Sequence, residues 1–125
     1  MELQNNATLT IFWNGDTVEL IYFHPTMLRG RFENIQRRRF RLYGIDSPEI
    51  HSKDGKEKEE GLKSKQFISN LILFKVVNIK FTKNDKFGRE MGDIIYKGEI
   101  INKKMIDSGH ARPYFGHKKE ASIFD

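Results

Sequence analysis

The chain contains no cysteine, which excludes disulfide bonds and metal sites built on thiolate ligands. It also has no run that approaches the roughly 20 consecutive apolar residues of a membrane-spanning helix, so we expect no membrane partner. Residues 1–6 lack the basic segment and the apolar segment of a signal peptide. The compartment therefore stays open between the cytoplasm and, for a trimmed mature form, the extracellular space.

The chain does contain a moderate share of apolar residues and an excess of positive charge. Hydrophobic residues make up 38% of the 125 positions and charged residues 31%, a balance typical of globular proteins. This length fits one domain over residues 1–125, which we expect to be monomeric. The net charge of +5 fits a polyanionic partner such as nucleic acid. Six arginines gather in one stretch, where they form either a binding surface or simply a solvated face: Arg29, Arg31, Arg37, Arg38, Arg39 and Arg41.

Alternating hydrophobicity predicts a β-hairpin near the N-terminus. Residues 8–13 alternate, Asn14-Gly15 is a strong signal for a tight turn, and the alternation resumes over residues 18–22. A long, polar and basic connection follows at residues 24–36. We expect this connection to contact a nucleic acid backbone.

The rest of the chain alternates between strand and helix patterns. We expect three more strands and two helices, at residues 37–45 (strand), 57–73 (helix), 75–82 (strand), 90–96 (strand) and 99–109 (short helix). The order predicts an α+β protein that is mainly β, a five-stranded OB-fold barrel. In it one helix lies between the third and fourth strands and a short helix follows the fifth. Barrels of this kind commonly bind nucleic acids across one face.

Three carboxylates lie near predicted turns. Asp46 follows the third strand, and Pro48 cannot continue a strand ladder, so the chain must turn and bring Glu49 back toward Asp46. Asp16 follows the first hairpin turn. Three adjacent carboxylates repel unless a cation joins them. Oxygen ligands alone, with no cysteine and no paired histidines, suit a hard ion such as Ca²⁺ or Mg²⁺.

Two arginines complete this candidate site. Arg41 lies on the third strand, five positions before Asp46, and Arg89 follows the predicted turn at residues 84–88. Guanidinium groups beside carboxylates and a metal ion suit a phosphodiester substrate, whose transition state gains charge on oxygens that arginine grips. Glu49 could then accept a proton from the attacking water. In the alternative, both arginines pair only with structural acids.

Three segments of the chain resemble a known family. "NGDTVEL", "FRLYGIDSPE" and "NDKFGREMGDI…INKKMIDSGHAR" resemble, in order and spacing, segments of the staphylococcal nuclease (thermonuclease) family, over about residues 9–112. The resemblance implies an OB-fold, Ca²⁺-dependent phosphodiesterase of DNA and RNA with low sequence specificity. Members of that family cut the 5′ P–O bond and leave 3′-phosphate ends.

The resemblance also implies a role for each matched residue of the metal site. Asp16 and Asp46 match the Ca²⁺ carboxylates, and the backbone carbonyl of Ser47 matches a further ligand, where the family usually has threonine. Glu49 matches the carboxylate that orients the attacking water. Asn14 stands where the family has an aspartate near the metal, which would weaken affinity for the ion.

Matched residues are also implied to bind substrate. Arg41 and Arg89 match the family's two phosphate-binding arginines, and Asp85 and Lys86 match a turn near the terminal phosphate of a bound nucleotide. The remaining substrate contacts are Phe87, which replaces a phosphate-binding tyrosine, and Tyr114, near the base pocket. Two other function classes stay open: a nuclease-like module that binds nucleic acid or modified peptides without cutting, and a basic interaction protein.

Overall fold

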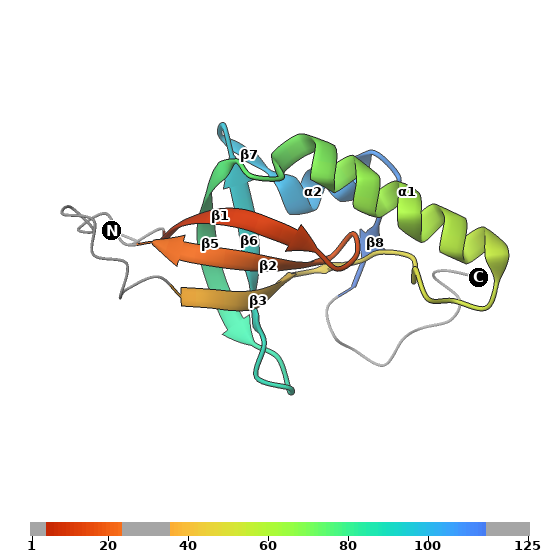
Figure 1. Ribbon diagram of the computed structural model, residues 1–125, viewed down its shortest axis with the longest axis horizontal. Coiled ribbons are helices and arrows are strands. Elements are labelled where there is room, and N and C mark those ends of the chain that lie inside the picture. Colours follow the sequence, from red (N-terminus) through yellow and green to blue (C-terminus); the bar gives the residue numbers. More distant parts are fainter. Residues whose placement is uncertain (1–4, 24–35, 115–125) are drawn as a thin grey trace.

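The computed structural model describes residues 5–23 and 36–114 (Figure 1). The basic connection predicted to touch nucleic acid and the chain beyond Tyr114 lie outside the described residues, apart from Gln36. The elements in order are β1 (Asn5–Phe12), β2 (Thr17–Phe23), β3 (Gln36–Leu42), β4 (Ile45–Asp46), α1 (Gly55–Ile72), β5 (Val76–Asn84), β6 (Glu90–Tyr96), β7 (Glu99–Ile100), α2 (Ile101–Asp107) and β8 (Arg112–Pro113).

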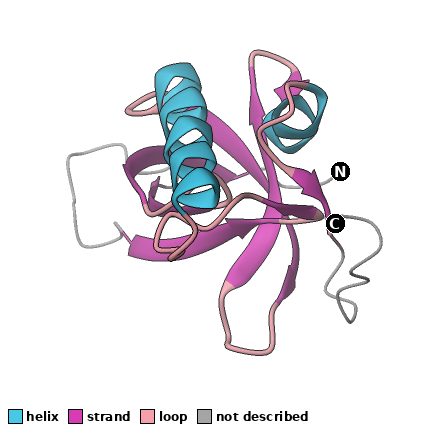
Figure 2. Cartoon of the chain, turned by 90° about the vertical axis from the view of Figure 1, so that its right-hand side faces the viewer, coloured by secondary structure: helices cyan, strands magenta, loops and turns pink. Residues whose placement is uncertain are grey.

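The strands form one large sheet and one small one. The large sheet has the order β3-β2-β1-β5-β6-β7, and β3 also pairs with β6 in parallel, so the sheet curls back toward its own edge. The small sheet joins β4 to β8. Both helices lie on one side, and the β5–β6 turn projects from the other (Figures 1 and 2). This is the expected α+β class, with an arrangement consistent with an OB-like fold.

The N-terminal hairpin exists, but its turn is longer than the predicted two-residue turn. Residues 13–16 separate β1 from β2, and the N–H of Trp13 donates to the carbonyl of Thr17 at 2.9 Å. A bulge between Leu9 and Ile11 shifts the strand register by one residue. Phe12 therefore faces the buried Val18, and Trp13 is left 45% exposed. The regular alternation predicted through residue 13 is thus wrong beyond the bulge.

The third strand is shorter than predicted. It ends at Leu42, and a turn at residues 43–44 separates it from β4. Gly44 has φ of 80°, a conformation that glycine adopts readily. The turn shifts the alternation of buried and exposed side chains by one residue. Ile45 is therefore buried, as Phe40 and Leu42 are. The same break turns Asp46 toward the residues described below.

The long helix begins two residues before the predicted start. Asp54 caps it, since its side chain accepts a hydrogen bond from the N–H of Lys56 at 3.0 Å. The helix buries Ile68 and Ile72 against the core, whereas Leu62 on the same helix is exposed. No helix in the described part of the chain is long and apolar enough to cross a membrane.

The C-terminal half contains two strands that sequence patterns did not predict, β7 and β8, because each spans only two residues. Between them α2 is fastened by Asn102, a buried residue. Its amide nitrogen donates to the carbonyls of Tyr43 at 2.9 Å and Gly92 at 3.0 Å, and its oxygen accepts from the N–H of Ile94 at 3.1 Å. One side chain thus ties α2 to β6 and to the β3–β4 turn.

Replacing Asn102 with leucine, a residue of similar size, should lower the free energy of unfolding by about 2–4 kcal/mol. The substitution leaves three backbone groups without their buried partner. Urea unfolding followed by circular dichroism measures the loss. Asn70→Leu on the exposed face of α1 is the control and should change stability by less than about 0.5 kcal/mol. Equal midpoints for Asn102→Leu and the parent chain would contradict this role.

Candidate active site

The centre of the candidate site is the carboxylate of Asp16, in the turn between β1 and β2. One oxygen, Oδ1, accepts from the hydroxyl of Thr17 at 2.9 Å, and the other, Oδ2, accepts from the N–H of Ser47 at 2.9 Å. The side chain of Asn14 shapes this turn, because its Oδ1 accepts from the N–H groups of Asp16 and Thr17 at 2.9 and 2.8 Å. The turn is therefore joined to the segment after β4.

Arg41 lies between two acids. Its Nη2 atom is 3.7 Å from Oδ2 of Asp16 and 3.6 Å from Oδ1 of Asp46, and it donates to the carbonyl of Ile45 at 3.0 Å. The side chain is only 14% exposed. A guanidinium this sheltered requires paired charge and hydrogen bonds, and both are present. The structure thus brings together Asp16, Arg41 and Asp46, as predicted.

Two close contacts hold the segment that carries Ser47. A Cβ atom added to Gly15 would lie 2.9 Å from the Cβ atoms of both Ser47 and Ser64 of α1, and a Cβ added to Gly61 would lie 2.8 Å from the carbonyl oxygen of Pro48. Larger residues at these positions would push α1 and the turn apart. Close packing therefore requires Gly15, in addition to the turn signal that predicted it.

The hydroxyl of Ser47 is buried and has no hydrogen-bond partner among the described residues. The backbone N–H of the same residue donates to Oδ2 of Asp16 at 2.9 Å, and a carboxylate oxygen is a ligand that hard cations prefer. Within residues 5–23 and 36–114, however, no three acidic or histidine side chains gather into a group that could hold a metal ion. The predicted three-carboxylate cluster is therefore not formed.

Glu49, the third carboxylate of that prediction, has other partners. Its Oε1 atom accepts from the N–H of His51 at 3.1 Å, within the turn that leads to α1. Its own N–H donates to Glu57 at 3.5 Å. Glu49 is exposed, on the segment between the small sheet and the helix. Its carboxylate is thus held by a local turn and makes no contact with Asp16 or Asp46.

Sequence patterns missed Arg112, which also belongs to this site. Its Nη2 atom donates to Oδ2 of Asp46 at 3.3 Å, and β8 pairs with β4 beside it. Tyr114, two residues further on, donates its N–H to the carbonyl of Gly44 at 2.8 Å. The centroid of its ring is 5.9 Å from the guanidinium carbon of Arg41. The predicted Tyr114 therefore does reach the site. A two-residue strand leaves no periodic signal by which Arg112 could have been found.

The second group of predicted residues lies at the β5–β6 turn. Oδ1 of Asp85 accepts from the N–H groups of Phe87 and Arg89, both at 2.8 Å, and its Oδ2 accepts from Nε of Arg89 at 2.6 Å. Phe87 is 73% exposed, with Lys86 and Arg89 cations 5.3 and 5.9 Å from its ring centroid. Asp85 thus stabilises the turn and binds Arg89 through Nε. No described residue accepts a hydrogen bond from the two terminal nitrogens of Arg89, Nη1 and Nη2.

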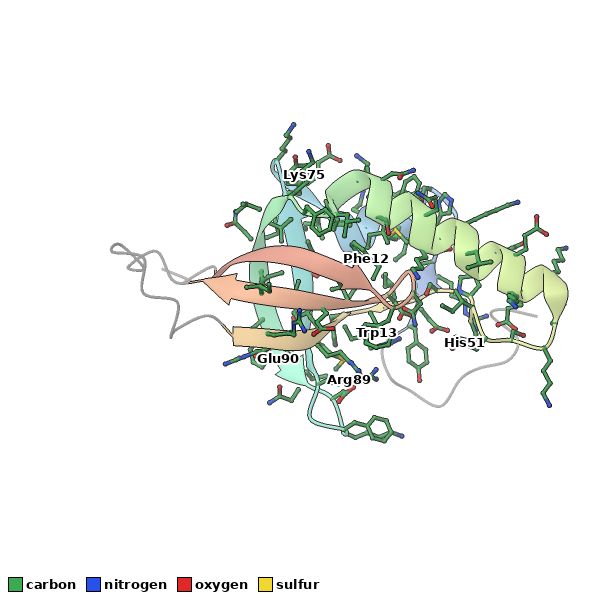
Figure 3. All side chains as sticks on the ribbon, viewed as in Figure 1. Phe12, Trp13, His51, Lys75, Arg89 and Glu90 are labelled. Atoms are coloured by element: carbon green, nitrogen blue, oxygen red, sulfur yellow. The ribbon has the colours of Figure 1, made fainter. Side chains whose placement is uncertain are left out.

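The pairing of β3 with β6 places the side chains of Arg41 and Arg89 on the same face of the sheet. In the parallel pair β3–β6, Phe40 is opposite Glu90 and Arg41 is opposite Met91. Side chains at every second residue share a face, so Arg89, just before β6, is on the face of Arg41. Arg38 and Glu90 confirm this alternation. They precede and follow the positions of Arg39 and Arg89 by one residue, and they form an ion pair at 2.7 Å on the opposite face. Figure 3 places Arg89 and Trp13 on the side of the sheet away from α1.

Comparisons with known proteins point to one protein family. A family model described as staphylococcal nuclease homologue matches residues 39–123. A staphylococcal-like nuclease of Arabidopsis thaliana is 32% identical over 85 residues, which is 68% of this chain and 24% of that protein. An uncharacterized 38.1 kDa protein of Capnoides sempervirens is 36% identical over 85 residues, or 68% of this chain and 23% of that protein. The chain thus spans about a quarter of the length of these curated relatives.

The environment of Asp85 gives a pH-dependent prediction. Burial alone would raise its pKa, but the N–H and guanidinium of Arg89 and the N–H of Phe87 stabilise the carboxylate, and the pKa is lowered below 3.8. Because the folded pKa is depressed, the turn's contribution to stability is present above pH 3.8 and is lost as the pH falls through the folded value. Arg89→Ala should move the pKa of Asp85 upward. Carbon-detected NMR titration checks this. Lys86→Ala should leave it in place, and an equal shift in both variants would contradict the assignment.

Proposed function

Because the chain belongs to the staphylococcal nuclease family, we propose that it is a metal-dependent nuclease that hydrolyses phosphodiester bonds of DNA and RNA with low sequence specificity. One observation carries the proposal beyond family membership. Arg41 and Arg89 share one face of neighbouring strands, and Arg41 is flanked by the carboxylates of Asp16 and Asp46. Cations beside paired acids on one sheet face suit an anionic substrate that is bound together with a metal ion.

In this proposal the two arginines bind the scissile phosphate. A guanidinium group can donate two parallel hydrogen bonds to phosphate oxygens, and it stays charged at any working pH. Arg89 is bound to Asp85 through Nε alone, so its two terminal nitrogens can donate to an oxygen of the substrate. Arg41 would give up part of its contact with Asp16 and Asp46 as the phosphate approaches. Both groups stabilise the charge that develops on phosphate oxygens in the transition state.

The proposed cofactor is Ca²⁺, with Mg²⁺ as the alternative. Asp16, Asp46 and the backbone carbonyl of Ser47 would hold it, a set of oxygen donors that Ca²⁺ commonly completes with water. The buried hydroxyl of Ser47, which has no partner among the described residues, supports a polar guest at this place. A bound divalent cation would supply charge neutralisation and a more acidic water molecule.

Glu49 is the proposed general base. It takes a proton from the attacking water, whose oxygen forms a new bond to phosphorus while the bond to the 5′ oxygen breaks. The 5′ oxygen takes up a proton from solvent water as it leaves and becomes a hydroxyl, and the phosphate stays on the 3′ side. Glu49 is exposed, and among the described residues its carboxylate accepts only from the N–H of His51, so its side chain can turn toward a bound phosphate. The remaining proposed contacts are Lys86, Phe87 and Tyr114, with Asp85 positioning the turn.

A second candidate function is a module that binds nucleic acid without cutting it. The observation in its favour is that both arginines already have carboxylate partners, Asp16 and Asp46 for Arg41 and Asp85 for Arg89. Structural pairs of this kind need no catalysis to explain them. In this alternative the same face binds the phosphate backbone and releases it unchanged, with an affinity that falls steeply as salt is added.

Cleavage with defined metals tests the proposal directly. Single-stranded and double-stranded DNA should be cut with Ca²⁺, left intact with chelator, and converted to products with 3′-phosphate and 5′-hydroxyl ends, which resist ligation until the ends are repaired. Activity with Mg²⁺ alone would keep the nuclease and reassign the metal, with Asn14 as the first residue to examine. Salt-sensitive binding without products under any condition would favour the non-catalytic module.

Variants test the residue roles. Glu49→Gln and Arg89→Ala should each lower kcat by about 10²–10³-fold, because each removes a group that acts on charge developing in the transition state. We expect kcat and kcat/KM to fall by the same factor. Steady-state cleavage of a labelled oligonucleotide measures both. Glu59→Gln and Lys103→Ala, at exposed helix positions, are the charge-matched controls and should cut at the parent rate. Parent rates for Glu49→Gln and Arg89→Ala would remove both residues from the mechanism.

A further inference from the structure

An exposed tryptophan lies beside the proposed phosphate site. Trp13 is the one tryptophan of the chain, and it is 45% exposed in the turn between β1 and β2. The guanidinium carbon of Arg39 is 4.8 Å from the centroid of its ring. The bulge in β1 is what turns Trp13 outward while Phe12 fills the core. A large apolar ring held at the surface under a cation is the arrangement that single-strand binding proteins use as a stacking platform.

Arg39 differs from the other arginines that the structure describes. Each of the other five lies within ion-pair distance of a carboxylate: Arg37 of Glu19, Arg38 of Glu90, Arg41 of Asp16 and Asp46, Arg89 of Asp85, and Arg112 of Asp46. Arg39 has no carboxylate partner among residues 5–23 and 36–114. Glu19 is opposite Arg39 on β2, but its carboxylate pairs with Arg37, so the donors of Arg39 are available to an anion from outside.

The position of Arg39 links this pair to the site. Arg39 and Arg41 are two residues apart on β3, so they share a face at a spacing of about 6.7 Å. The parallel register places Arg39 opposite Arg89 on the neighbouring strand, because Phe40 is opposite Glu90. Figure 3 likewise places Trp13 and Arg89 on the same side of the sheet. Arg39, Arg41 and Arg89 thus lie on one surface of the sheet, with Trp13 at its edge.

We propose that Trp13 and Arg39 form a nucleotide subsite on this surface for single-stranded nucleic acid. Arg39 binds the phosphate next to the one held by Arg41 and Arg89, and the exposed face of Trp13 stacks on the base beyond it. The subsite rests on the proposed nuclease function for its substrate, but it requires only binding. The subsite would therefore bind nucleic acid whether the protein is a nuclease or a module that does not cut.

The stacking contact selects a single strand. A base can lie on Trp13 only when it is unpaired and turned out of the neighbouring stack. A strand whose bases are splayed apart can place successive phosphates on Arg41 and Arg39, and it frees a base to lie on Trp13. A duplex keeps its bases paired and cannot offer one to the ring. The subsite therefore favours single strands over duplexes.

Intrinsic fluorescence tests the subsite independently of cutting. Trp13 is the only tryptophan, so its emission reports on this place alone. Titration of the full chain with a ten-nucleotide oligothymidylate in chelator should quench the emission to a saturating value. Arg39→Ala should raise the dissociation constant about fivefold or more, as loss of one stacking and phosphate contact predicts. An unchanged emission throughout the titration would overturn the proposal.

Variants separate the subsite from general charge and from folding. Lys75→Ala is the matched control: it removes one positive charge at an exposed position that Figure 3 places well apart from Trp13. It should bind the oligonucleotide as the parent does, and a loss equal to that of Arg39→Ala would overturn the subsite in favour of diffuse attraction. Trp13→Ala, followed with an end-labelled oligonucleotide, should lose binding as Arg39→Ala does. Trp13→Phe should keep most of it, and thermal melts establish that each variant is folded.

Cleavage kinetics distinguish failure of the subsite from failure of the proposed function. A thymidine dinucleotide has a single phosphodiester and cannot reach the subsite. Arg39→Ala should therefore raise KM for the ten-nucleotide substrate and leave kcat/KM for the dinucleotide unchanged. Equal losses on both substrates would overturn the subsite, since the pair would then act on the reacting phosphate. If no metal supports cutting while quenching and its loss in Arg39→Ala persist, the nuclease function fails and the subsite stands.

Discussion

The hydrogen bond from the N–H of Ser47 to the carboxylate of Asp16 is the constraint on which the site depends. It joins two segments 31 residues apart, the turn of the first hairpin and the chain that leaves β4. Gly15 reinforces the bond by letting the turn approach Ser47 and α1 without an intervening side chain. Asp16 can then face Arg41 only because the turn is held there. The metal-binding and phosphate-binding roles proposed for these residues therefore share one structural support.

Charge balance at Arg41 explains why this support is stable before any ligand binds. Two carboxylates at 3.6 and 3.7 Å from one guanidinium nitrogen would repel each other if the cation were absent. Arg112 adds a second cation on the outer oxygen of Asp46. The four side chains together are close to neutral, which lowers the cost of burying them. A divalent cation and an anionic phosphate that arrive together would leave that balance nearly unchanged, whereas either one alone would disturb it.

Sequence patterns predicted the regular elements well and their interruptions poorly. Phe40 and Leu42 mark β3 because both belong to one buried face, and Ile68 and Ile72 mark α1, whose cap at Asp54 lies before the predicted start of the helix. The bulge near Thr10 and the break at Gly44 shift the phase of a strand by one residue, and only pairing with a neighbouring strand reveals such a shift. Asp16, Arg41 and Asp46 were predictable as a group from their matched segments. Arg112 was not, because its contact depends on a two-residue strand paired across 66 positions.

The arginines of β3 illustrate how far composition alone carries a functional argument. As a run of like charges they fit a solvated face or a polyanion-binding surface equally well. The structure divides them by their partners: Arg37 and Arg38 belong to ion pairs across the sheet, and Arg41 pairs with Asp16 and Asp46 of the site. Of the arginines in β3, only Arg39 makes no ion pair with a described residue, and it lies beside an aromatic ring. Glu19, the acid opposite Arg39, is already paired with Arg37. The place to expect contact with a nucleotide on this strand therefore follows from which arginine is left without an ion pair, and not from the number of cations.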